Sequence, residues 1–129
     1  MKRIGRGIRR VAGRMNDLEL RYQKYLSEQQ RAGYVVKFAF EAIKLRLADK
    51  TSWTPDFYVM RPDGLIEFHD TKGTTSKKTA KGRVKGPWIE QHANIKMKVA
   101  AEMYPFRFFA VWLDGGVWQY QEYGSCPAT

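Results

Sequence analysis

Two aspartates and a lysine follow short apolar segments at a spacing that could hold a metal ion and activate water. Asp56 stands in segment 54–57, Thr-Pro-Asp-Phe, and both Asp70 and Lys72 stand in segment 68–73, Phe-His-Asp-Thr-Lys-Gly. Because alternate residues of a strand point to the same side of a sheet, Asp70 and Lys72 should share one face. If the two segments pair as a hairpin, Asp56 joins them at one edge of the sheet.

This group of side chains suits the hydrolysis of a phosphodiester. Hydrolysis adds negative charge to the phosphoryl oxygens, and Mg²⁺ or Mn²⁺ on hard oxygen ligands stabilises that charge and acidifies a bound water. Asp56, Asp70 and the backbone carbonyl of Thr71 would form a partial metal shell with room for water and phosphate. Lys72 would orient the attacking water or help to deprotonate it. The alternative is a surface ion pair between Asp70 and Lys72, worth under about 1 kcal/mol.

Local patterns predict the elements that must position these residues. Pro62 and Gly64 mark a turn between strands 54–60 and 65–72, so these strands should form an antiparallel hairpin. The other predicted elements are a helix from Asn16 or Asp17 to Gly33, extended chain over 34–47, a turn over 48–52, a basic loop over 74–87, a helix over 88–104, and strands over 106–113 and 117–123. Their order predicts an α/β fold, with a mixed central sheet of about five strands flanked by two helices.

The net charge of +10 is concentrated in two segments that contain no acidic residue. The predicted DNA-binding residues are the basic residues of these segments: Lys2, Arg3, Arg6, Arg9, Arg10 and Arg14 in segment 1–14, and Lys77, Lys78, Lys81, Arg83 and Lys85 in segment 74–87. Such segments can bind phosphates through counterion release, whereas solubilising tails are the alternative. The length of 129 residues predicts a single domain, over 15–129, and the basic, acid-free composition of 1–14 predicts a flexible arm before it. No apolar run reaches the roughly 18–20 residues of a membrane span.

Segments 54–57 and 68–73, their hairpin and the following helix resemble the core of the PD-(D/E)XK nuclease superfamily. The resemblance is strongest to small phage-encoded members related to Holliday-junction resolvases, and segments 41–49 and 96–109 also resemble that group. It covers about residues 17–113. It implies a restriction-endonuclease-like core and a Mg²⁺-dependent endodeoxyribonuclease.

The resemblance also implies a role for each site residue. Asp56 and Asp70 would bind the metal, and Lys72 would assist the water. Many members add a glutamate from the first helix, and Glu19 is the matching candidate; a solvated helix residue is the alternative. The sequence departs from the common pattern because Asp70 replaces a glutamate and Thr71 replaces an apolar residue. The loop over 74–87 looks like an insertion after the catalytic strand.

Three hypotheses follow. The first is a structure-selective, phage-type endonuclease of DNA recombination, expected to act on branched or duplex DNA as a cytoplasmic homodimer without a membrane partner. The second is a non-catalytic nucleic-acid-binding module that uses the basic arms. The third is an assembly protein that binds a polyanion. His69 should face away from Asp70 and be packed or hydrogen-bonded rather than catalytic.

Overall fold

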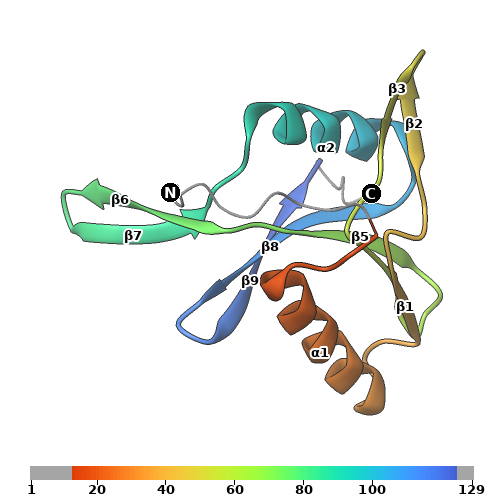
Figure 1. Ribbon diagram of the computed structural model, residues 1–129, viewed down its shortest axis with the longest axis horizontal. Coiled ribbons are helices and arrows are strands. Elements are labelled where there is room, and N and C mark those ends of the chain that lie inside the picture. Colours follow the sequence, from red (N-terminus) through yellow and green to blue (C-terminus); the bar gives the residue numbers. More distant parts are fainter. Residues whose placement is uncertain (1–12, 125–129) are drawn as a thin grey trace, which may run out of the picture.

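A five-stranded mixed sheet forms the centre of the structure, with one helix on each face (Figure 1). The computed structural model describes residues 13–124. Across the sheet, the strands lie in the order β1 (Lys37–Phe40), β4 (Phe57–Met60), β5 (Ile66–Thr71), β8 (Arg107–Asp114) and β9 (Val117–Tyr123). Strands β5 and β8 run parallel, and the other neighbouring pairs are antiparallel. This arrangement confirms the predicted α/β fold of about five strands and two helices.

Helix α1 (Asp17–Arg31) begins where the sequence predicts. The Asn16 side chain accepts a hydrogen bond from the Glu19 N–H at 2.8 Å, and the Asn16 N–H donates to Glu19 Oε1 at 2.9 Å. These reciprocal bonds form a capping box, which satisfies two of the amide groups that a helix start leaves unpaired. The helix ends at Arg31 with Ala32 as its C-cap, and Gly33 takes the positive φ of 92° that turns the chain away.

The two helices cover separate hydrophobic clusters on opposite faces of the sheet. The cluster beneath α1 consists of Tyr22, Leu26, Val35, Phe57, Val59 and Val111. The cluster beneath α2 (Gln91–Met103) consists of Leu45, Leu47, Phe68, Met97, Ala100, Phe108, Ala110 and Tyr123. Alternation along the strands sends neighbouring residues to different clusters, so β5 presents Phe68 to α2 and His69 to α1. The face on which each β5 residue lies is therefore fixed by packing.

The chain between the first helix and β4 departs from the prediction. Extended chain was expected over 34–47 and a turn over 48–52, but the chain leaves the sheet after β1, where Glu41 takes a φ of +47°. It then forms a second hairpin, β2 (Leu45–Ala48) and β3 (Thr51–Trp53). Leu45 and Leu47 bury the inner side of this hairpin against the α2 cluster. Because one face of this hairpin is buried, part of the predicted turn over 48–52 forms strand β3 instead.

The prediction of an irregular loop over 74–87 is wrong. This segment forms an antiparallel ribbon of β6 (Thr74–Thr79) and β7 (Gly82–Pro87), which extends away from the central sheet (Figure 1). Thr74, Thr75 and Val84 are β-branched residues that favour strands, and Gly82 takes the positive φ of 113° at the tip. Both strands are exposed along most of their length, so the basic side chains of this segment are compatible with a ribbon.

Helix α2 begins at Gln91, three residues later than predicted, and ends before Tyr104. Glu90 precedes it without a side-chain cap, so the start of this helix has weak local signals. Over residues 13–124, no helix is long and apolar enough to cross a membrane.

Candidate active site

The β4–β5 hairpin brings Asp56 and Asp70 together. Phe57 pairs with His69, so Asp56, one residue before β4, lies beside Asp70 near the end of β5. The backbone N–H of Asp56 donates to Asp70 Oδ1 at 2.9 Å. Both aspartates are buried, each with 7% of its surface exposed. The hairpin thus places the two carboxylates side by side, as the spacing predicted, at the ends of two inner strands of the sheet.

Thr71 holds the carboxylate of Asp56. Its backbone N–H and its hydroxyl both donate to Asp56 Oδ2, each at 2.9 Å. An apolar residue at this position would lack the second of these bonds, which comes from the hydroxyl. The role of the Thr71 carbonyl as a metal ligand stays a prediction.

The negative charges of Asp70 and Glu19 act unfavourably on the carboxylate of Asp56. Burial raises the pKa of Asp56 well above its ordinary value, and the nearby charges of Asp70 and Glu19 raise it further. The two bonds from Thr71 oppose this rise but do not cancel it. A site that disfavours the negative charge of its own carboxylate is a site that a cation would stabilise.

Lys72 supplies the positive charge of the site. Its Nζ lies 2.9 Å from Asp70 Oδ2, and the two side chains are 12% and 9% exposed. The Lys72 backbone N–H donates to the Val111 carbonyl at 2.8 Å, which ties the end of β5 to β8. The buried pair differs from a surface ion pair because little water screens it.

Glu19 is buried, with 2% of its surface exposed, so the alternative of a solvated helix residue is wrong. Its Oε1 accepts the capping bond from Asn16, and its charge contributes to the raised pKa of Asp56. The spacing of Asn16 and Glu19, which is that of a capping box, could have predicted this bond. Within the described part of the chain, no three histidine, cysteine or acidic side chains are arranged to hold a metal ion together. The charge of Glu19 acts on Asp56 from the start of α1, and the role of Glu19 as a metal ligand stays a prediction.

The ribbon begins directly after the site. Its root is closed by the Trp88 N–H, which donates to the Gly73 carbonyl at 2.9 Å. The basic residues of the ribbon are all exposed: Lys77, Lys78, Lys81, Arg83 and Lys85. Of the predicted arm, Arg14 is described and exposed, whereas Lys2, Arg3, Arg6, Arg9 and Arg10 lie outside the described residues.

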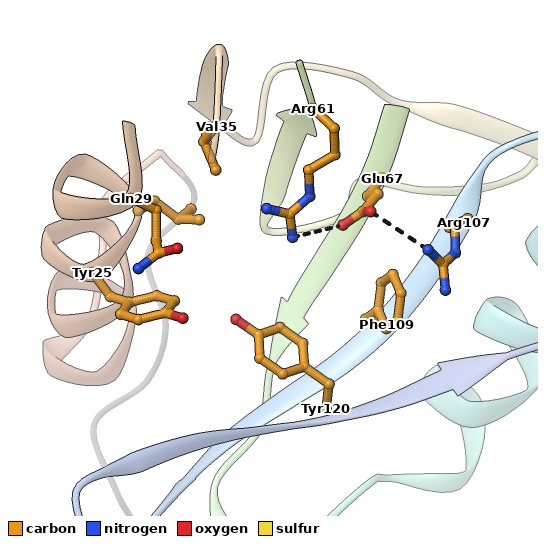
Figure 2. A pocket seen from close by; sticks show the side chains of 9 residues that line it. Tyr25, Gln29, Val35, Arg61, Glu67, Arg107, Phe109 and Tyr120 are labelled. Carbon is orange, nitrogen blue, oxygen red and sulfur yellow. Dashed lines mark hydrogen bonds and ion pairs between the residues drawn. The ribbon is translucent and has the colours of Figure 1, made fainter. Parts of the chain in front are cut away.

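A buried polar network that the sequence did not reveal lies on the other face of β5. His69 is 1% exposed; its Nε2 lies 2.8 Å from Glu67 Oε1, and its Nδ1 is hydrogen-bonded to the Tyr22 hydroxyl. Arg61 donates to the same Glu67 oxygen at 3.1 Å, and Figure 2 shows Arg61 and Arg107 on either side of Glu67. The prediction that His69 faces away from Asp70 and is packed and hydrogen-bonded is confirmed.

The protonation states of this network follow from its burial. Burial lowers the pKa of His69, so the ring is neutral at neutral pH. Because the ionised carboxylate of Glu67 can only accept, Nε2 of the neutral ring carries the proton and donates to Glu67, and Nδ1 accepts from the Tyr22 hydroxyl. Burial acts to raise the pKa of Glu67, but the bonds from His69 and Arg61 outweigh it and hold this pKa at about 2. The network is a charged, satisfied structural unit beneath α1.

Comparison with known proteins found no matching family, no matching curated sequence and no matching solved structure.

Proposed function

We propose that this protein is a metal-dependent DNA endonuclease of the PD-(D/E)XK type. The observation that carries the proposal is the buried group formed by Asp56, Asp70 and Lys72. In it, one backbone N–H links the two aspartates and Lys72 contacts Asp70 at 2.9 Å. Two buried carboxylates with an adjacent ammonium group suit phosphodiester hydrolysis better than they suit a stable core.

The donor set fits Mg²⁺ or Mn²⁺. Both aspartates offer hard oxygen atoms, and Mg²⁺ is commonly held by one or two carboxylates together with water and substrate phosphate. The crowding that raises the pKa of Asp56 supports the same assignment, because a divalent cation would remove the electrostatic cost of the second carboxylate. Glu19, whose charge already contributes to the raised pKa of Asp56, would add a further carboxylate to the metal site from the start of α1. When bound, the ion would stabilise the charge that develops on the phosphate and lower the pKa of a water molecule.

The residues of the chain have distinct roles in this proposal. Asp56 and Asp70 hold the cation, and Thr71 fixes the orientation of Asp56 through two hydrogen bonds. Lys72 stands where its ammonium group would orient a water molecule and offset negative charge at the phosphate. The exposed ribbon that follows would attract the phosphate backbone through its five basic residues.

The proposal extends to the DNA substrate, the oligomeric state and the cellular location. A structure-selective, phage-type enzyme of DNA recombination that resolves Holliday junctions would cut two strands symmetrically, and therefore would act as a homodimer. Such an enzyme would work in the cytoplasm, where its DNA is found. Sedimentation velocity across a range of protein concentrations tests the dimer.

A non-catalytic nucleic-acid-binding module is the second candidate, and the exposed basic ribbon is the observation that favours it. The two functions differ in their need for metal. Cleavage should be assayed on a four-way junction, a linear duplex and a single strand, each with Mg²⁺, Mn²⁺ or EDTA. The proposal expects metal-dependent cutting that EDTA abolishes. Folded protein that binds these DNAs without cutting any of them would favour the binding module.

A further inference from the structure

A hollow of about 470 Å³ separates the β6–β7 ribbon from the body of the protein. The ribbon forms one wall, and the start of α2 and the end of β9 form the other. Ile89 and Asn94 line it beside and within the start of α2, and Gln121 and Tyr123 line it from β9. The volume lies within the range of about 300–1,000 Å³ that is typical of pockets for small ligands, so a single nucleotide fits and a duplex does not.

The two faces of the ribbon have different chemistry. In the register, Lys77 pairs with Val84 and Thr75 pairs with Gly86, and these four residues line the hollow. The alternate residues point the other way, because side chains alternate along a strand. This outward face carries the cross-strand pairs Ser76–Lys85 and Lys78–Arg83. Three of the five basic residues of the ribbon are therefore on the face that does not line the hollow.

The hollow lies on the same side of the central sheet as Asp70. Asp70 pairs with Ala110, and Ala110 pairs with Gln121, which lines the hollow. Paired residues of neighbouring strands share a face, and strands are about 4.8 Å apart, so Gln121 and Asp70 are about 10 Å apart on that face. An extended chain that occupied the hollow would be within a few residues or nucleotides of the candidate active site.

The lining fits an unpaired nucleotide. Val84, which is 54% exposed, and Ile89 provide apolar surface for the faces of a base, and Gln121 provides a hydrogen-bonding amide for its edges. The Tyr123 hydroxyl donates to Asn94 Oδ1 at 2.8 Å, which leaves the Asn94 amide nitrogen to donate to a base. Lys77 provides one cation for a phosphate. None of the lining residues is acidic, which favours an anionic ligand. Nearby, Trp88 is 60% exposed at the root of the ribbon, where its indole is open to stacking.

We propose that this hollow receives an unpaired segment of a nucleic acid while the outward face of the ribbon holds the phosphates of the adjoining duplex. The inference rests on the proposed function for the identity of the ligand and defines its substrate class: duplex DNA with unpaired nucleotides at a fork, flap or branch. The ribbon would separate the unpaired strand from the duplex beside Asp70 and Lys72.

The test measures binding by the whole protein in EDTA, where no cleavage occurs. Fluorescence anisotropy gives the Kd for a blunt duplex and for a forked duplex with the same paired sequence and two unpaired arms. The fork should bind about tenfold more tightly than the duplex, as expected when bases gain stacking contacts. Equal affinity for the two DNAs would overturn the inference, as would the absence of binding to either.

Two variants of matched bulk locate the effect. Gly86→Leu fills the hollow, and a Cβ at Gly86 meets no atom within 4 Å, so the backbone can accept the change. It should reduce the preference for the fork to under about threefold and leave the duplex Kd within about twofold. Ser76→Leu adds a similar group on the outward face and removes the hydrogen bonds that Arg83 donates to Ser76. Because both DNAs contact that face, it should weaken binding to the fork and to the duplex by the same factor and keep the preference for the fork. If both variants lost the preference for the fork to the same extent, the proposal that the hollow receives the unpaired strand would be refuted.

A second readout covers the case in which Gly86→Leu fails to fold. 2-Aminopurine in an unpaired arm should change its fluorescence on binding, and Lys77→Gln should weaken fork binding more than duplex binding. Failure of the proposed function is distinguishable from failure of this inference. If the protein binds forks selectively but does not cleave DNA in Mg²⁺, only the proposed nuclease function is refuted. If it cleaves DNA but does not bind forks selectively, only the proposed role of the hollow is refuted.

Discussion

Glu67 should make one of the largest single contributions to folding among the charged residues, and Glu67→Gln tests this. The carboxylate lies beneath α1 with 5% of its surface exposed, and it accepts hydrogen bonds from both His69 and Arg61. A pKa lowered from 4.5 to about 2 corresponds to roughly 3 kcal/mol of stability at neutral pH. Because the glutamine keeps one accepting oxygen, we expect Glu67→Gln to lower the free energy of unfolding by about 2–3 kcal/mol.

The pH dependence of that loss gives a sharper test. A carboxylate whose pKa is lowered in the folded state stabilises the protein above its unfolded pKa of 4.5 and loses this effect as pH falls towards about 2. The difference in stability between the parent protein and Glu67→Gln should therefore be constant from pH 7 to pH 6 and shrink to under half by pH 3.

Urea unfolding followed by tryptophan fluorescence measures this difference at each pH. Glu102→Gln, on the exposed side of α2, is the matched control and should change stability by less than about 0.5 kcal/mol. A Glu67→Gln loss as small as that of the control, or a loss that stays constant down to pH 3, would refute the reasoning.

Three further predictions concern the candidate site and its supports. Asp56→Asn should raise the free energy of unfolding at pH 7 by about 1 kcal/mol. The pKa of Asp56 is raised in the folded protein, so its negative charge costs stability above the ordinary titration range of an aspartate. Thermal unfolding scans should show that the gain disappears below about pH 4. Calorimetric titration of the protein with Mn²⁺, in buffers of different ionisation enthalpy, should show that metal binding releases protons and becomes tighter as pH rises. A heat of Mn²⁺ binding that is the same in Asp56→Asn as in the parent protein would contradict this. Asn16→Ala removes the capping box that holds Glu19, so it should cost about 1 kcal/mol of stability, whereas a cost near zero would mean that the cap contributes little.

Much of the site was predictable because it depends on short-range rules. Pro62 and Gly64 define the turn, alternation along β5 sets Asp70 and Lys72 on one face, and the antiparallel pairing then brings in Asp56. None of these steps needs knowledge of distant packing.

The parts that sequence reasoning missed depend on partners far along the chain. Glu67 is stabilised by residues that pack against it only in the folded sheet, and the hydrogen bond from His69 to Glu67 follows from the burial beneath α1. The β2–β3 hairpin exists because Leu45 and Leu47 find the α2 cluster, which a local pattern cannot show. The ribbon was missed for a different reason, since its many lysines and small polar residues concealed the strand preference of Thr75 and Val84.

Single-turnover cleavage by Lys72→Ala tests the central claim most directly. The rate should be measured on a branched DNA substrate in Mg²⁺, beside the parent protein and Lys78→Ala, which removes an equal charge from the exposed ribbon. If Lys72 assists the attacking water from its position 2.9 Å from Asp70, the variant should lose at least about 100-fold in rate while its DNA affinity changes little. Lys78→Ala should weaken binding and cut normally at saturating protein. Cleavage by Lys72→Ala at the parent rate, or no metal-dependent cleavage by the parent protein, would contradict the account.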